Sequence, residues 1–162
     1  MGEHLELARH LFGLGFSVLP LGENKVPVRK WKRLQTERCN ADELGEWFGR
    51  WGYRPGIITG ELSGIVVVDC DDATTTETVA RAGFASDTQQ QTRRGRHFVF
   101  SHPGYRTKNR VRVAGRPVDV RGDGGFVVAY PAALNWTKKQ IVDCPCFCEW
   151  TLENHLLTSG TF

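Results

Sequence analysis

The sequence has 162 residues, of which 40% are hydrophobic and 24% are charged. These values are typical of a folded domain with a sizeable core, and they exclude a disordered tail. No apolar stretch approaches the roughly 18 residues that span a bilayer, and the N-terminus lacks the order of a signal peptide. We therefore expect a cytosolic protein, and five cysteines, an odd number, suit such a reducing compartment.

The basic residues are concentrated in two windows, although the net charge is only +3. Residues 25–33 contain five Lys/Arg and no acid, and residues 93–121 contain nine Lys/Arg and one acid, Asp119. The rest of the chain is therefore acidic. Such segregation is typical of a surface that binds a phosphate-bearing partner, and solvated surface charge is the alternative.

The first part of the chain predicts two helices and three strands. Apolar spacing predicts a helix over residues 3–14, and a strand follows over residues 16–21. A capping box, Asn40 with Glu43, begins the second helix, where an aromatic stripe at helical spacing is expected in the core: Leu44, Trp47, Phe48 and Trp51. Residues 56–59 and 64–69 are predicted strands joined by the tight "GELSG" turn.

The second part predicts one helix and three strands. Asp72 or Thr74 caps a helix that ends near Gly83. The strands are predicted at residues 96–100, 116–122 and 125–130, and "GDGG" between the last two predicts a hairpin. This mixed order predicts an α+β sheet domain without regular βαβ winding, and we find no boundary that would divide residues 1–162.

The strongest predicted strand, "GIVVVDCDD", ends in three acids, Asp69, Asp71 and Asp72. Side chains alternate along a strand, so Asp69 and Asp71 project from one face, roughly 7 Å apart at Cβ. Two like charges so placed repel unless a cation lies between them, and Mg²⁺ or Mn²⁺ prefers such oxygen ligands. Asp119, in "PVDVR", is the candidate third ligand; a simple helix-capping role for an acid here is the alternative.

A histidine follows a glycine and a cluster of arginines in "RRGRHFVF". Alternation sets His97 on the same side as Val99 and opposite Phe98. A histidine at the start of a strand is often only structural. Its position directly after an arginine-rich turn favours contact with an anion.

Together these motifs resemble the bifunctional primase-polymerase domain of the archaeo-eukaryotic primase superfamily, found in replication proteins of phages and plasmids. The resemblance runs from about Ala8 to Pro131. It comprises "GFSVLPL", then Lys25, Pro27 and Trp31, then "GIITGELSGIVVVDCD", then Thr92, Gly95 and His97, and finally "VDVRGDGGFVVAYP". The three superfamily motifs fall on Asp69 with Asp71, on Gly95 with His97, and on Val118 with Asp119.

The resemblance implies a fold with an RNA-recognition-like (RRM-like) catalytic sheet and an N-terminal α/β unit, in one primase-polymerase domain or a fragment of a larger replication protein. It implies a nucleotidyltransferase that initiates or extends a primer on single-stranded DNA from nucleoside triphosphates. It implies the cytoplasm of a bacterial or archaeal host, and a helicase domain in the full-length protein is a candidate partner.

The resemblance also assigns site residues. Asp69, Asp71 and Asp119 would be catalytic and would hold two Mg²⁺ or Mn²⁺ ions. The triphosphate would be bound by His97, Arg121, Arg93, Gly95 and Lys25. We further expect the polar connection before Asp119 to be a mobile loop over the site whose cations touch template: Arg106, Lys108, Arg110 and Arg112.

Some positions depart from the family pattern. Pro131-Ala132-Ala133 stands where many relatives have Pro-Pro-Ser, and Gly95 stands where many have Ser, which removes possible hydroxyl contacts. Three crowded cysteines, Cys144, Cys146 and Cys148, with the distant His155, supply a tetrahedral zinc site poorly, so we expect packing thiols.

Two other functions stay open. A metal-dependent nuclease would use the same acids but usually places a Lys or His base beside them, and "VVVDCDD" has none adjacent. A non-catalytic origin-binding module would not need all three acids.

Overall fold

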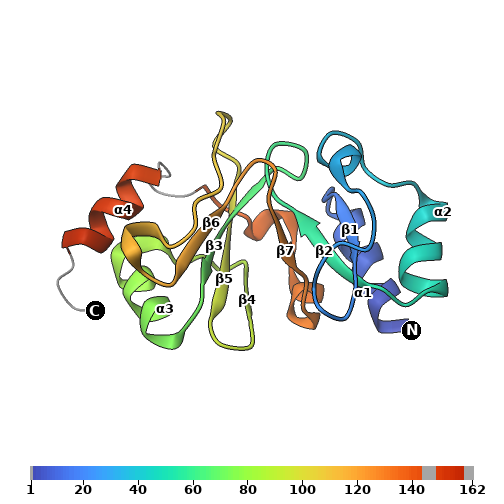
Figure 1. Cartoon of the computed structure of the whole chain (residues 1–162), viewed down its shortest axis with the longest axis horizontal. Helices are drawn as coiled ribbons and strands as arrows, with labels where there is room; N and C mark the ends of the chain where they lie inside the picture. Colours follow the sequence, from blue (N-terminus) through green and yellow to red (C-terminus); the bar gives the residue numbers. More distant parts are fainter. Residues whose placement is uncertain (1, 144–148, 159–162) are drawn as a thin grey trace.

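The computed structural model describes residues 2–143 and 149–158. The chain forms two antiparallel sheets that lie side by side, with helices on their outer sides (Figure 1). The predicted α+β class with antiparallel pairing is confirmed. Within these ranges no helix is both long and apolar enough to cross a bilayer.

The first sheet has the order β1-β2-β7. Its strands are β1 (Val18–Leu21), β2 (Arg54–Ile58) and β7 (Phe126–Val128). Helix α1 (Gly2–Gly13) packs against it, next to α2 (Ala41–Leu44) and its continuation η2 (Gly45–Arg50). Leu7, Leu11, Trp47 and Phe48 are buried in this half.

The second sheet has the order β4-β5-β3-β6. Its strands are β3 (Ile65–Cys70), β4 (Gln89–Gln91), β5 (Arg96–Ser101) and β6 (Val118–Arg121). Its outer face is covered by α3 (Ala73–Val79), η3 (Ala80–Phe84) and α4 (Glu149–Thr158). Single-turn helices connect the rest: η1 (Lys32–Gln35), η4 (Val113–Gly115), η5 (Pro131–Asn135) and η6 (Lys138–Gln140).

Alternation along β3 decides which way the acids face. Val66, Val68 and Cys70 pack with α3 and α4 in one core cluster. Ile65 and Val67 belong to the other cluster, with the first sheet. Asp69 is next in that second row, so its side chain faces the space between the two sheets.

The capping predictions are confirmed. The Asn40 side chain accepts a hydrogen bond from the Glu43 backbone N–H, and the Glu43 side chain accepts one from the Asn40 backbone N–H. The Asp72 side chain accepts a hydrogen bond of 2.7 Å from the Thr75 backbone N–H, so Asp72 rather than Thr74 caps α3.

The hairpin predicted at "GDGG" is wrong. Strand β6 pairs with β3 and β7 pairs with β2, so residues 122–125 carry the chain from one sheet to the other. A Cβ on Gly122 would lie 2.2 Å from the Thr107 carbonyl oxygen, so only glycine allows this close crossing. The Asp123 carboxylate accepts a hydrogen bond of 2.8 Å from the Thr107 N–H and fixes the crossing.

Trp51 also differs from its predicted place in the core. The α-helix ends at Leu44, and residues 45–50 form a π-helix in which the Trp51 N–H donates to the Glu46 carbonyl. A π turn contains one residue more than the α spacing assumes, which rotates Trp51 away from Trp47. Trp47 is therefore buried, whereas Trp51 is 43% exposed.

Candidate functional site

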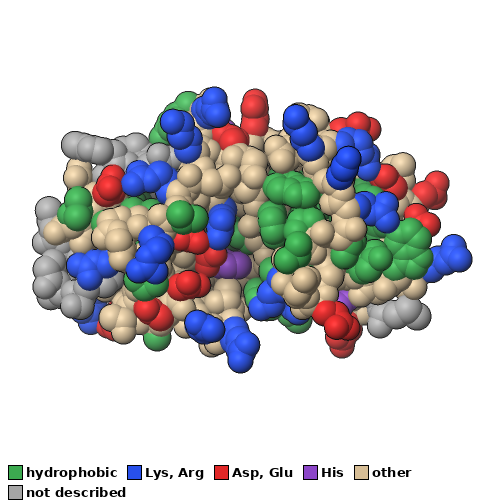
Figure 2. All heavy atoms as spheres, viewed as in Figure 1, with side chains coloured by type: hydrophobic (Ala, Val, Ile, Leu, Met, Phe, Trp, Pro, Cys, Tyr) green, Lys and Arg blue, Asp and Glu red, His purple; other side chains and the backbone are tan. Residues whose placement is uncertain are grey.

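A pocket of about 390 Å³ lies between the two sheets. Figure 2 shows acidic side chains and a histidine near the centre of this face, next to hydrophobic side chains, with Lys and Arg side chains around them. The residues that line the pocket come from both sheets and both basic windows: Lys25, Asp69, Asp71, Thr92, Arg93, Arg94, His97, Arg121, Phe126, Val127, Val128 and Tyr130.

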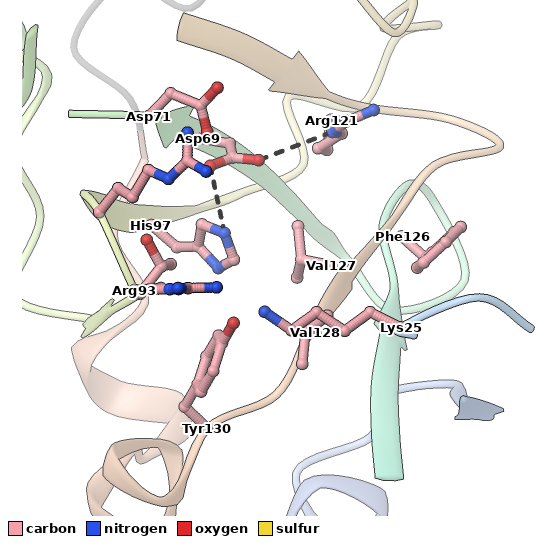
Figure 3. Close-up of a pocket in the computed structure, with 12 residues that line it drawn as sticks. Lys25, Asp69, Asp71, Arg93, His97, Arg121, Phe126, Val127, Val128 and Tyr130 are labelled. Atoms are coloured by element: carbon pink, nitrogen blue, oxygen red, sulfur yellow. Dashed lines mark ion pairs between the residues drawn. The ribbon is translucent and has the colours of Figure 1, made fainter. Parts of the chain in front are cut away.

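Three of the predicted residues form one row across the second sheet. Asp69 is paired with His97 on β5 and with Asp119 on β6. The His97 Nε2 lies 3.2 Å from the Asp69 Oδ1 (Figure 3). Asp69, His97 and Asp119 are far apart in the sequence, and the antiparallel pairing of β3 with β5 and β6 brings them together.

Arg121 lies between the two paired carboxylates. Its Nη2 is 2.8 Å from the Asp119 Oδ2, and its Nε is 3.9 Å from the Asp69 Oδ2. This Nε is buried and has no hydrogen-bond partner in the described part of the chain. The guanidinium therefore neutralises part of the acidic charge and keeps one donor unused beside the pocket.

Asp119 is engaged on both oxygens and does not line the pocket. Besides Arg121, it accepts a hydrogen bond of 2.8 Å from the Arg112 backbone N–H. Asp71 differs, because its exposed carboxylate has no hydrogen-bond or ion-pair partner among residues 2–143 and 149–158. Over the same residues, no group of three or more His, Cys, Asp or Glu side chains is arranged to hold a metal ion.

A residue that the sequence did not reveal, Gln90, fixes the orientation of His97. Gln90 is 1% exposed, and its Oε1 accepts a hydrogen bond of 2.9 Å from the Tyr130 backbone N–H. Its Nε2 lies 2.8 Å from the Val128 carbonyl oxygen and 2.8 Å from the His97 Nδ1. A backbone N–H can only donate and a carbonyl can only accept, so the amide has one possible orientation.

The amide orientation determines the tautomer of His97. Because the Gln90 Nε2 donates, the His97 Nδ1 is the acceptor, and the ring proton lies on Nε2. That Nε2–H is directed at Asp69 and at the pocket. In the structure Asp69 accepts from this N–H, and a phosphate oxygen is an acceptor of the same charged kind.

Cationic side chains line the pocket on both sides, Lys25 from the first half of the chain and Arg93 from the second (Figure 3). The Lys25 Nζ lies 5.8 Å from the centroid of the Tyr130 ring, and the Arg54 guanidinium lies 6.0 Å from the same centroid. Arg93 lines the same space after β4. Lys25 and Arg93 belong to different basic windows, so the two windows meet at this pocket.

Gly95 does not line this pocket. A Cβ at this position would lie 1.9 Å from the Cys70 carbonyl oxygen, so the turn before β5 requires glycine to pass β3. The absence of a serine hydroxyl here has a steric cause, and nucleotide binding by Gly95 stays a prediction.

The predicted mobile loop over the site is wrong in its placement. The Arg110 backbone forms hydrogen bonds of 2.9 Å and 2.7 Å with Val120, so this segment runs along the edge of β6. The Arg110 side chain forms an ion pair with Glu153 in α4, at 3.2 Å. Four predicted template contacts lie outside the lining of the pocket: Arg106, Lys108, Arg110 and Arg112. Their contact with template stays a prediction.

Cys70 lies between the two acids in the sequence but points away from the pocket. Burial, followed by the negative charge of Asp69, raises the pKa of the Cys70 thiol to about 12. The residue is a packing thiol in the core under α3. Cys144, Cys146 and Cys148 lie outside the described residues.

The fold and pocket define an α+β chain in which a cleft between two antiparallel sheets is lined by acids at the end of β3 and by cations from both basic windows. Comparison with protein-family models matches residues 8–150 to the family described as bifunctional DNA primase/polymerase, N-terminal. The match covers most of the chain, so this chain belongs to that family, and the resemblance inferred from the motifs is confirmed. The search of curated proteins finds no match.

Proposed function

We propose that the chain is a DNA-templated nucleotidyltransferase that makes or extends a primer from nucleoside triphosphates. One observation carries the proposal: in a member of this family, Asp69, Asp71 and the cations Lys25, Arg93 and Arg121 line one pocket. A triphosphate needs cationic groups along its phosphates and carboxylates near its reacting phosphorus. We also propose that residues 1–162 form a single domain with the pocket at its centre.

The donor set fits divalent cations of the Mg²⁺ and Mn²⁺ class. The acids offer only hard carboxylate oxygens, and Asp71 is exposed at the pocket with no partner in the residues described. Asp69 and Asp71 would hold such ions, with Asp119 as third ligand after Arg121 releases it. Bound ions would supply charge neutralisation and lower the pKa of a primer 3′-hydroxyl.

The residues of the chain have separate tasks in this proposal. The Nε2–H of His97 donates to a phosphate oxygen, held in that orientation by Gln90. Arg121 exchanges the Asp119 carboxylate for a phosphate oxygen, which then accepts from the Nη2 that Asp119 holds in this structure. Lys25 binds the remaining phosphate charge from the opposite wall, and Arg93 binds it from the turn between β4 and β5.

The tautomer of His97 argues against the nuclease alternative. A histidine that activates water needs a free basic nitrogen, but the Nδ1 of His97 already accepts from Gln90 and the Nε2 carries the proton. The non-catalytic alternative predicts DNA binding without synthesis.

The experiment that separates these functions uses a single-stranded template, labelled nucleoside triphosphates and Mn²⁺ or Mg²⁺, with and without an annealed primer. Extension of the primer supports the polymerase activity, and products without primer support priming. Shortened template or primer would indicate a nuclease. DNA binding with no change in either strand would indicate a binding module.

A further inference from the structure

The exposed Trp51 lies on a surface that the pocket does not explain. The Arg29 guanidinium lies 5.4 Å from the centroid of the Trp51 ring, and the Tyr53 ring lies edge-on to it at 5.8 Å. The π turn before Trp51 causes the exposure. Such turns are rare and frequently occur at functional sites. The exposed Trp51 ring is therefore a candidate ligand-binding position.

A short segment connects Trp51 to the pocket. Lys25 lines the pocket, Arg29 reaches Trp51, and the apolar residues between them, Val26 and Val28, are 53% and 38% exposed. The Val28 N–H donates to the Pro20 carbonyl, which fixes this segment on β1. Figure 2 shows hydrophobic side chains that extend from the central hollow across the half that holds α2, with Lys and Arg side chains beside them.

We name the Trp51 surface after its residues: Lys25, Val26, Val28, Arg29, Lys30 and Trp51. The Trp51 surface is positively charged. Arg29 and Lys30, like the neighbouring Lys32, are exposed and form no ion pair with any described residue. Aromatic rings combined with unpaired cations are typical of surfaces that bind single-stranded nucleic acid, where bases stack and phosphates contact the cations. A protein partner would not need this excess of cations.

We propose that the Trp51 surface binds the unpaired single-stranded DNA template outside the pocket. A base stacks on Trp51, and the phosphates on either side of it contact Arg29, Lys30 and the neighbouring Lys32. This inference rests on the proposed function, because a templated enzyme must hold template that has not yet been copied.

The test compares Trp51→Ala and Trp51→Phe with the wild type in binding oligothymidylates of about 4 and about 16 nucleotides, the range of site sizes of such platforms. For the longer strand we expect Trp51→Ala to weaken binding about 5- to 150-fold, the loss of one base–aromatic stack. Trp51→Phe keeps a ring and should lose much less. Unchanged affinity of Trp51→Ala for the longer strand would overturn the proposal, and a protein partner would then be the alternative ligand of the Trp51 surface.

A second variant removes charge without touching the aromatic ring. Lys30→Ala with Lys32→Ala should reduce the dependence of log affinity on log salt by about 1.4, at roughly 0.7 per phosphate contact. Lys138→Ala with Lys139→Ala is the matched control and should leave the slope unchanged. Identical slopes for both double variants would contradict the proposal. If the wild type binds DNA through Trp51 but incorporates no nucleotide, the proposed function fails and the Trp51 surface stands.

Discussion

Asp69 lies directly opposite Asp119 in the antiparallel register of β3 and β6. Like charges opposite one another on neighbouring strands destabilise a sheet. Arg121 offsets this repulsion, with its Nη2 at 2.8 Å from Asp119 and its Nε at 3.9 Å from Asp69. The sheet therefore holds the two acids side by side because the Arg121 side chain neutralises part of their charge. A bound cation would neutralise the same charge.

Replacement of either pocket acid should stop synthesis without unfolding the protein. We expect Asp69→Ala and Asp71→Ala to reduce nucleotide incorporation by about 100-fold or more, because each removes a carboxylate from the reacting centre. Asp71→Ala should change the free energy of unfolding by less than about 0.5 kcal/mol, since Asp71 is an exposed residue. Primer extension and thermal melting measure the two effects.

Asp87→Ala is the matched control for these variants, because Asp87 is an exposed acid that does not line the pocket. Its incorporation should equal that of the wild type. Near-normal incorporation by both pocket variants would reject the assignment of Asp69 and Asp71.

Gln90 should act through the tautomer of His97. Gln90→Glu keeps the size of the side chain and an acceptor for the Tyr130 N–H, but it places an acceptor opposite the His97 Nδ1. We expect Nδ1 to take a proton and donate to the new carboxylate, visible in the ¹⁵N shifts of the imidazole. The affinity for nucleoside triphosphate should fall about tenfold, because the added negative charge repels phosphate. An unaltered ¹⁵N pattern would show that Gln90 only fills space.

Arg121→Ala should weaken nucleotide binding and also destabilise the acid pair. We expect a higher KM for nucleotide, because one phosphate contact is lost, and a lower Tm, because Asp69 and Asp119 then face each other unscreened. Added Mn²⁺ should raise the Tm of this variant more than that of the wild type. Arg81→Ala, at an exposed ion pair on α3 and η3, is the control and should show neither effect.

Regular alternation in the sequence predicted which way two of the candidate site side chains point. The apolar residues of β3 and β5 set the direction of Asp69 and His97, and a two-residue period leaves little choice. Gln90 was missed because β4 is a three-residue polar strand, "QQQ", with no apolar alternation. Its one detectable signal was the position of a polar run just before the arginine-rich turn.

The errors came from places where tertiary contacts override local patterns. "GDGG" satisfies the composition of a hairpin turn, but Gly122 passes against Thr107 and leads into the other sheet. Trp51 follows α-helical spacing, yet one π turn is enough to move it to the surface. Neither feature has a sequence period, so only the structure reveals it.

Alkaline pH should reduce stability through Cys70. Its pKa is raised from 9.0 to about 12 by burial and by Asp69, so the folded state keeps a proton that the unfolded state loses. This contribution is complete below pH 9 and falls as the pH rises from 9 towards 12. Urea titrations across this range should show a decline in the free energy of unfolding that is smaller in Cys70→Ala. Equal declines in the two proteins would contradict the buried thiol.

The four cations between β5 and β6 provide the last test, and the structure divides them into two pairs. The Arg106 and Lys108 side chains are exposed, whereas the Arg110 side chain is paired with Glu153 and the Arg112 guanidinium donates to the Gly115 carbonyl. A template strand that contacts this edge would gain most from the exposed pair, because those cations need not leave another partner.

We expect replacement of all four by Ala to weaken single-stranded DNA binding about equally for different sequences, since phosphate contacts carry no base information. The salt slope should become shallower by a few units, at about 0.7 per lost contact, and Arg106→Ala with Lys108→Ala alone should account for about half of that change or more. Incorporation at saturating template should stay near the wild-type rate, because none of the four lines the pocket. Fluorescence anisotropy at several salt concentrations measures the slopes. If the fourfold variant and the wild type give superimposable slopes, these side chains are solvated surface charge and the template lies elsewhere.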